Sequence, residues 1–269
     1  MSAQAKPVGD HIRSWRLRRR MSQMDLALEA EISTRHLSFL ETGRSRPSRD
    51  MVLHLADRLD IPLRERNVLL TAAGFAAVYP ERAFGDPDLA VARRGIEMIL
   101  AGHEPYPALV VDLQWNLVAA NGAVTFLLEG LDPSLLTPPV NMMRLALHPL
   151  GLASRTVNLA EWRAHALDRL RRQIDLTADP GVIALLEELM TYPEPPASDR
   201  RPQDLGGVAV PFQLLTDGQV LSFYGTTTVF GTASDITLAE LTLETFVPAD
   251  AVTSQALQGA HAARQGHSA

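Results

Sequence analysis

The segment that most restricts the fold is SQMDLALEAEISTRHLSFLETGRSRPS, residues 22–48. Ser22 followed by Asp25 has the pattern of a capping box and opens one short helix, and Ser33 can cap a second helix directly after a turn. Gly43 then supplies a favourable stop for the second helix. Helices this short are unstable alone, so the sequence predicts that the two pack against each other and against neighbouring helices.

Three more amphipathic patterns surround this pair within the first 75 residues. One lies near HIRSWRLRRR, and two others, RDMVLHLADRLD and LRERNVLLTAAG, follow the pair. Five short helices in so short a segment must share one small core. We therefore expect an all-α five-helix domain over residues 1–75. A linker over residues 76–90 follows, where Pro, Gly and Asp interrupt the periodicity.

Charge is unevenly divided along the chain. The 269 residues carry a formal net charge of −6, but 13 of the 25 Lys and Arg residues and only 9 of the 31 Asp and Glu residues lie in residues 1–78. The N-terminal part therefore carries +4 and the remainder −10. This asymmetry predicts that a polyanionic partner is met by the N-terminal part.

The helix pair has the layout needed to read the major groove of double-stranded DNA. Such reading needs a helix held across the groove by a partner helix, with short polar or cationic side chains near its N-terminus. Arg35 can make a bidentate contact to guanine, and Thr34 can contact base edges or a thymine methyl group. Arginines just after the helix, and Gln23 at the start of its partner, suit phosphate anchoring. The candidate DNA-binding residues are Gln23, Ser33, Thr34, Arg35, His36, Ser38, Arg44, Arg46 and Arg49.

Residues 8–75 resemble the helix-turn-helix domain of the XRE/Cro/C1-type repressors. The resemblance rests on Gln23, the small Ala27, Ile32 in the turn and the closing LETGRSRPS. It implies contacts to phosphates or bases for Gln23, Thr34, Arg35 and Ser38.

One position departs from that pattern. Glu31 stands at the turn position where such domains frequently have Gly, and a left-handed backbone there costs a non-Gly residue roughly 1 kcal/mol. A five-helix protein-interaction domain with an ordinary arginine-bearing surface is the alternative.

The longer C-terminal part has strand-like patterns at both ends. YPALVVDLQWNLVAANGAV suggests a strand pair before a helix, and helical patterns follow. VAVPFQLLTDGQVLSFYGTTTVFG has two strand-like runs around the hairpin signal Asp217-Gly218, and ITLAELTLETFVP can add a further strand. This order predicts an α+β domain over residues 91–250, with an antiparallel sheet built from both ends of the segment. Residues 251–269 are expected to form a disordered tail.

This part resembles the C-terminal domain of MmyB-like transcription regulators, on the segments GHEPYPALVVDLQWNLVAANGAV, PPVNMMRLALHP and NLAEWRAHALDRLRRQI. The resemblance runs from about residue 95 to residue 248. It implies a PAS-like fold that binds a small apolar molecule, with a fatty acid as the leading candidate. Asn121 is expected to cap the helix that follows the strand pair.

Flexible Met and large Phe side chains suit the wall of an apolar pocket, although core packing is the competing interpretation for each of them. A carboxylate would need a cation or polar donor, and Arg144 and His148 are the nearest by sequence. The candidate ligand-binding residues are Phe126, Met142, Met143, Arg144, Leu145, His148, Phe212 and Phe223. Trp115 and Trp162 are expected to serve packing. The RLRRQ run is expected to be a solvated helix face, with a contribution to DNA or dimer contacts as the alternative.

Other functional classes lack their sequence signals. The chain has no Cys, no GxxxxGKS/T loop, no Gly-rich dinucleotide turn and no nucleophile beside a base, so we expect no catalytic residues and no enzyme. His103, His148 and His165 fall in different predicted elements, so no metal site is expected, and the only cofactor-like group expected is a bound fatty acid or similar apolar ligand. A haem group held by His103 or His148 is the alternative.

No apolar run approaches the roughly 18–20 residues that cross a bilayer, and the N-terminus lacks a signal-peptide core. We therefore expect a cytoplasmic protein without a membrane partner.

Together these patterns predict a sequence-specific transcription regulator that binds double-stranded DNA through its first domain and senses a small apolar ligand through its second. One short helix on a domain of charge +4 gives limited affinity, so we expect a homodimer that reads an inverted repeat. Ligand occupancy would then alter the relative placement of the DNA-reading domains. The alternative function is a protein-interaction module, with the C-terminal domain as the dimerisation unit.

Overall fold

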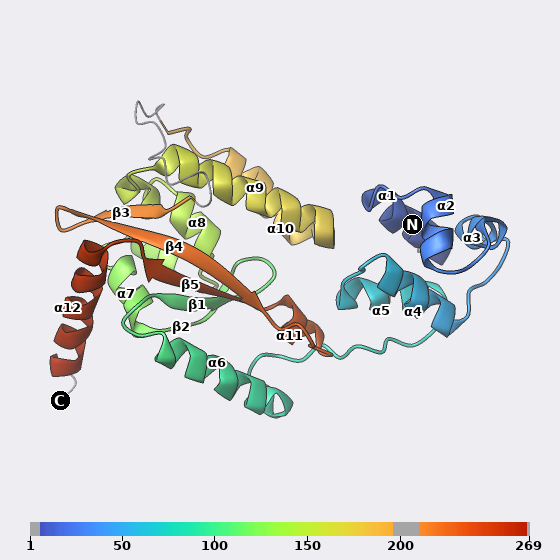
Figure 1. Ribbon diagram of the computed structural model, residues 1–269, viewed down its shortest axis with the longest axis horizontal. Coiled ribbons are helices and arrows are strands. Elements are labelled where there is room, and N and C mark those ends of the chain that lie inside the picture. Colours follow the sequence, from blue (N-terminus) through green and yellow to red (C-terminus); the bar gives the residue numbers. More distant parts are fainter. Residues whose placement is uncertain (1–5, 196–209, 268–269) are drawn as a thin grey trace. The chain divides into compact units, whose positions relative to one another are not determined.

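The computed structural model describes residues 6–195 and 210–267 of the chain. Contacts divide it into two compact units, one of residues up to 82 with the short segments 175–177 and 232–239, and one of the remaining residues. The expected fold class is confirmed: five helices precede a domain of helices and an antiparallel sheet (Figure 1).

Serine caps explain where the N-terminal helices begin. Ser22, Ser33 and Ser48 each accept a hydrogen bond from the backbone N–H three residues further on, and Ser22 with Asp25 completes the expected capping box. Gly43 has a φ of 72°, as the stop after the third helix requires. The helices are α1 (Val8–Arg18), α2 (Gln23–Glu29), α3 (Thr34–Glu41), α4 (Arg49–Arg58) and α5 (Leu63–Ala72).

The turn between α2 and α3 keeps a left-handed residue that is not glycine. Glu31 has a φ of 52°, and the N–H of Ile32 closes the turn by donating to the Ala27 carbonyl at 2.9 Å. Leu26 and Leu37 are fully buried on either side of the turn. Their burial holds α2 and α3 together and offsets the strain at Glu31.

Gly9 lets α1 approach α3 closely. A Cβ atom at this position would lie 2.4 Å from the carbonyl oxygen of Leu40 and 2.7 Å from that of Glu41, distances that real Cβ contacts do not show. Only glycine fits, so α1 forms a fixed support behind α3.

The second part of the chain alternates between sheet and helix. Short 3₁₀ helices lie at Pro87–Leu89, Pro133–Leu136 and Leu152–Arg155. The other elements are α6 (Ala90–Gly102), β1 (Ala108–Val111), β2 (Leu117–Ala120), α7 (Gly122–Leu128), α8 (Met142–Leu147), α9 (Leu159–Thr177), α10 (Pro180–Met190), β3 (Phe212–Thr216), β4 (Gln219–Val229), α11 (Ile236–Glu240), β5 (Thr242–Pro248) and α12 (Ala251–His267).

The sheet has the strand order β2-β1-β5-β4-β3, and all its neighbouring strands are antiparallel. Strands from both ends of the segment therefore meet between β1 and β5, as expected. All four residues of β1 are buried, so both faces of the sheet are covered there. Leu109 and Val111 of β1 share an apolar cluster with residues of α8, α9 and α10, so these three helices cover one face of the sheet.

The hairpin between β3 and β4 follows its sequence signal. Asp217 and Gly218 have φ values of 50° and 78°, the positive pair that a two-residue type I′ turn needs. β3 and β4 then pair in continuous register from Thr216↔Gln219 to Phe212↔Phe223.

The C-terminal segment is a helix, contrary to the expectation of a disordered tail over residues 251–269. Residues 251–267 form α12, and Leu257 is buried in the same apolar cluster as Phe223. Thr253 is fully buried, and its Oγ1 accepts a hydrogen bond from the Ser222 N–H at 2.9 Å. These contacts order the helix although its sequence is rich in small and polar residues.

Asn121 precedes α7 but does not cap it with its side chain. The side chain is buried, and its Nδ2 donates to the Tyr106 carbonyl at 2.7 Å while its Oδ1 accepts from the Ala108 N–H at 3.1 Å. Asn121 therefore fixes the connection that leads from α6 into β1.

Candidate functional site

The exposed face of α3 is the first candidate site. Leu37 and Leu40 are buried behind it, and the Ser33 hydroxyl is engaged as the helix cap, accepting from the His36 N–H at 3.1 Å. The remaining predicted contacts around this face are exposed or half-buried; they are Thr34, Arg35, His36, Ser38, Arg44, Arg46 and Arg49.

Phe39 organises two of the cations on this face. The guanidinium carbon of Arg35 lies 5.3 Å from the centre of the Phe39 ring, and that of Arg44 lies 5.9 Å from it. Both distances suit cation–π attraction, which limits the freedom of the long side chains. The half-buried ring thus links a cation at the start of α3 to one in the following loop.

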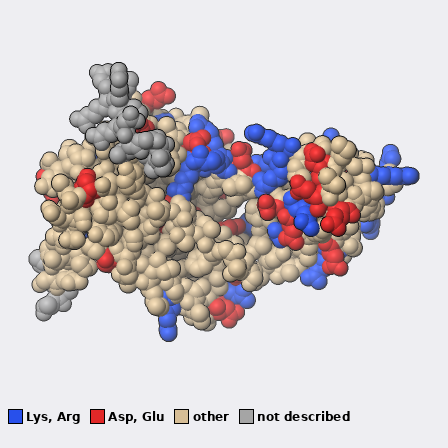
Figure 2. Space-filling view, viewed as in Figure 1, with Lys and Arg blue, Asp and Glu red and all other residues tan. Residues whose placement is uncertain are grey.

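The loop after α3 folds back onto the helix. The Ser45 N–H donates to the Phe39 carbonyl at 3.1 Å, which holds Arg44 beside the ring. In the view of Figure 2, Lys and Arg side chains project from the edge of the N-terminal domain where α3 lies. This edge can meet a phosphate backbone and base edges together.

Gln23 is partly engaged within the domain. Its Nε2 donates to the Glu41 carboxylate at 2.7 Å. An amide nitrogen carries two hydrogens, so the second hydrogen is available to a phosphate oxygen. The contact to Glu41 fixes the direction in which Gln23 points.

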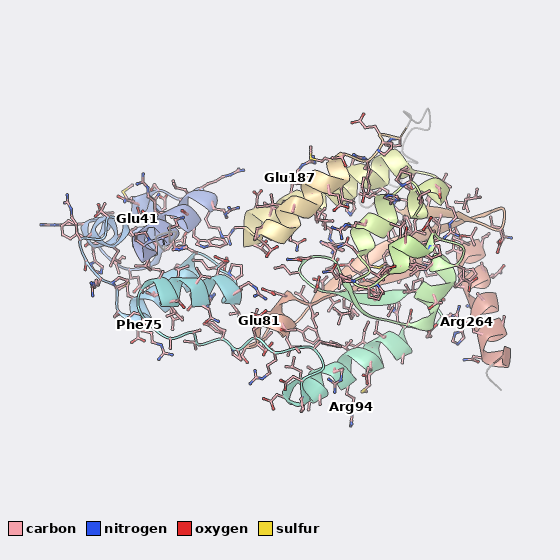
Figure 3. All side chains as sticks on the ribbon, turned by 180° about the vertical axis from the view of Figure 1, so that it is seen from behind. Glu41, Phe75, Glu81, Arg94, Glu187 and Arg264 are labelled. Atoms are coloured by element: carbon pink, nitrogen blue, oxygen red, sulfur yellow. The ribbon has the colours of Figure 1, made fainter. Side chains whose placement is uncertain are left out.

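A buried ion pair connects α1 to α3. Glu41, labelled in Figure 3, accepts two hydrogen bonds from Arg16, at 2.6 and 2.9 Å. The side chains are only 8% exposed for Arg16 and 2% for Glu41. Burial by itself would raise the pKa of Glu41, but hydrogen bonds from Arg16 and Gln23 and the charge of Arg16 outweigh it and lower that pKa below its ordinary 4.5.

The lowered pKa of Glu41 predicts that the N-terminal domain loses stability in acid. A carboxyl whose pKa is lower in the folded state stabilises the fold fully above the unfolded value of 4.5, and this contribution is lost as the pH falls through the lower folded pKa. Amide hydrogen exchange of residues 8–72 from pH 6 to pH 3 measures the loss. The double variant Arg16→Met, Glu41→Leu lacks the titrating pair and should show a flatter pH dependence; equal slopes would contradict the prediction.

The second candidate site is a cavity of about 510 Å³ in the C-terminal domain. It lies between α7, α8 and α9 on one side and the sheet on the other. Its wall is mostly apolar and includes Leu109, Trp115, Val124, Leu127, Leu128, Met142, Met143, Ala146, Leu152, Trp162, Ala166, Phe212, Tyr224, Gly225 and Phe246.

The charged part of the cavity wall comes from α9 and β5. Arg169 pairs with the buried carboxylate of Glu244, with one bond at 2.9 Å, and also donates to Thr227 Oγ1 at 2.8 Å. Its guanidinium carbon lies 4.5 Å from the centre of the Trp115 ring. Arg172 and His165 also line the cavity, so three basic side chains face one acidic one. Figure 2 shows Lys and Arg side chains gathered over α9.

The predicted ligand residues divide into two groups. Met142, Met143 and Phe212 line the cavity, whereas Leu145 and Phe223 are fully buried in a neighbouring apolar cluster against which Phe126 packs.

Arg144 and His148 also lie outside the cavity wall. Arg144 pairs with Glu188 at 2.7 Å, and the His148 ring contacts the Tyr192 ring with centroids 5.1 Å apart. They face α10 because α8 turns its other side toward the cavity.

Sequence reasoning missed the contribution of α9. Two arginines of the RLRRQ run, Arg169 and Arg172, line the cavity with His165, at an i, i+4, i+7 spacing that places all three on one helix face. Trp115 and Trp162, which were expected to serve packing, line it as well. The spacing along α9 was a visible signal, but the pattern alone does not tell a solvated basic face from a cavity wall.

Among the described residues, no group of three or more His, Asp or Glu side chains is placed to hold a metal ion. Over the same residues, no helix combines the length and the apolar character needed to cross a membrane.

Comparison with known proteins gives two matches along the chain. Residues 92–260 match the MmyB-like transcription regulator ligand binding domain, and residues 7–69 match a helix-turn-helix domain. The helix-turn-helix match includes α3, and the ligand-binding match includes the residues of the cavity wall. A search of curated proteins found none that matches the chain.

Proposed function

The chain belongs to the family of MmyB-like transcription regulators, and from this premise we propose that its cavity holds a fatty acid or a similar apolar ligand and that occupancy alters how the protein binds DNA. A helix-turn-helix domain joined to an MmyB-like ligand-binding domain makes it a ligand-responsive, DNA-binding transcription regulator. The matched families are those of transcription regulators, which are generally not enzymes.

The cavity is the observation that supports a fatty acid. Its volume of about 510 Å³ falls within the range typical of small-molecule sites. The wall is apolar over α7, α8 and most of the sheet, where Glu244 is the acidic exception, while the basic groups come from one face of α9. An amphiphile with one long apolar part and one small polar end suits such a wall, and Met142 and Met143 can adapt to a flexible alkyl chain.

We also propose that the protein acts as a homodimer on an inverted repeat. α3 has eight residues, so a single copy reads only a short half-site. A two-fold symmetric dimer reads two such half-sites and gains affinity from both.

Arg35 provides the test of DNA reading. Replacing Arg35 with Ala is expected to cost about 1–3 kcal/mol at one base pair of each half-site and to relax the sequence preference there, because a bidentate contact to guanine is lost. Selection from a random DNA library, with the wild-type and variant proteins side by side, measures this preference.

Arg58→Ala is the matched control for Arg35→Ala. It removes the same charge from an exposed position on α4, which leaves the reading face intact. An Arg35→Ala protein that loses affinity equally for all sequences would mean that Arg35 only anchors phosphate. Failure of the wild-type protein to retard any DNA fragment at low salt would favour a protein-interaction module instead.

A further inference from the structure

We infer that Arg172 selects ligands with an anionic head group, by exchanging its surface partner Asp168 for the carboxylate of the bound molecule. This inference rests on the proposed function, since it concerns the charged end of the same cavity. The charged end of the ligand would then lie beside α9.

Arg169 is already neutralised and cannot easily change partners. Glu244, with a side chain only 6% exposed, pairs with it through both oxygens and also accepts from Thr227 Oγ1 at 3.2 Å. A ligand carboxylate that took Arg169 would leave the buried Glu244 carboxylate without its cation, which is strongly unfavourable. The pair of Arg169 and Glu244 is therefore a fixed part of the wall.

Arg172 is held much more weakly. Its side chain is 60% exposed, and its partner Asp168, one helical turn earlier, is 54% exposed. Exposed pairs at this spacing contribute little to stability, so the exchange of one carboxylate for another costs little. Arg172 lines the cavity and Asp168 does not. A ligand carboxylate at the wall can therefore reach Arg172, whereas Asp168 is not part of this wall.

The balance of charge at this end favours an anion. Arg169 and Glu244 cancel within the wall, whereas Arg172 is balanced only by Asp168, which does not line the cavity and which a ligand carboxylate can replace. His165 also lines the cavity, and its ring centroid lies 5.5 Å from that of Trp162. Burial lowers the pKa of His165, and the nearby charges of Arg169 and Arg172 lower it further, against smaller effects of Asp168 and Glu244. His165 therefore adds little positive charge to this end of the cavity.

Matched ligands with different head groups test this assignment. Trp115 and Trp162 both line the cavity, so their fluorescence in the full-length protein reports binding of tetradecanoic acid and of tetradecan-1-ol. For the wild-type protein we expect the acid to bind at least about tenfold more tightly than the alcohol, as a charge-assisted hydrogen bond allows.

Variants on α9 then separate the head group from the apolar wall. Arg172→Gln should lower the affinity for the acid about tenfold and leave the affinity for the alcohol unchanged. Arg172→Lys keeps the charge, so its affinity for the acid should be close to that of the wild-type protein. Arg171→Gln is the matched control: it removes the same charge from the adjacent, exposed residue, which does not line this cavity. It should leave both ligands unchanged.

The possible outcomes distinguish this inference from the proposed function. Equal affinity of the wild-type protein for acid and alcohol overturns the inference and leaves an apolar ligand in place. An equal loss of affinity for both ligands in Arg172→Gln also overturns the inference, because Arg172 would then contribute only to the shape of the wall. If neither compound changes the tryptophan fluorescence or the thermal stability, the fatty-acid proposal itself fails.

Discussion

Replacing Glu41 with Ala is expected to destabilise the N-terminal domain by about 3–5 kcal/mol, because it leaves the charge of Arg16 buried without a partner. Arg16 is 8% exposed in its side chain and has two hydrogen bonds to Glu41, with one further bond to the Met21 carbonyl at 2.9 Å. The pair also fixes Gln23, so α1, α2 and α3 all lose a shared contact. Most small domains have a total stability of only about 5–15 kcal/mol, so this loss would remove a large share of the stability of the domain.

Hydrogen exchange of the full-length protein measures this effect domain by domain. Residues 8–72 should lose protection in Glu41→Ala, while the peptides of the sheet keep it. Glu29→Ala is the control, because it removes an exposed carboxylate of α2. Arg16→Met with Glu41→Leu should recover much of the protection, since a well-packed apolar pair commonly replaces a buried ion pair without loss. Unchanged protection in Glu41→Ala would show that the pair does not stabilise the domain.

Replacing Gly225 with Phe is expected to weaken binding of long-chain ligands strongly without unfolding the C-terminal domain. Gly225 lines the cavity from β4, and a Cβ atom there would be 3.7 Å from the nearest atom of Phe246, an ordinary van der Waals contact. Gly225 and Thr227 lie on the same face of β4 and both line the cavity, so we expect the new ring on the cavity side. Crowding of this kind costs about 1–3 kcal/mol, so affinity should fall by roughly 5- to 150-fold.

Stability should change little in Gly225→Phe, because glycine weakens a strand interior and Phe is favourable in one. Thr228→Phe is the control, since it adds the same ring to an exposed position on the other face of β4. Calorimetric titration with tetradecanoic acid compares the two variants with the wild-type protein. Wild-type affinity in Gly225→Phe would show that the ligand does not occupy this cavity.

The N-terminal domain could be predicted from its sequence because its signals are local. Ser22 with Asp25, Ser33 and Gly43 specify helix ends within a few residues, and the structure places each of them as expected. The buried pair of Arg16 and Glu41 was not foreseen. It joins residues 25 positions apart, and each looks like an ordinary surface charge in its own helix pattern.

The cavity could be predicted only in part, because its wall is assembled from distant elements. Met142 and Phe212 line the cavity as predicted. Arg144 instead faces α10, and Phe223 is buried in the neighbouring cluster. Which side of a helix or strand meets a cavity depends on packing across the sheet, and apolar patterns mark only that a side is buried. The same limit applies to α12, whose order comes from contacts to β4.

The most direct test of the account is the effect of ligand on DNA affinity. Fluorescence anisotropy with a selected DNA site gives the Kd of the full-length protein with and without saturating tetradecanoic acid. A coupling of about 1–3 kcal/mol between two sites corresponds to a change of roughly 5- to 150-fold, and the ligand affinity must change by the same factor when DNA is present. We predict a change of at least about fivefold that disappears in Gly225→Phe. An unchanged Kd for DNA, with the acid shown to be bound, would contradict the account.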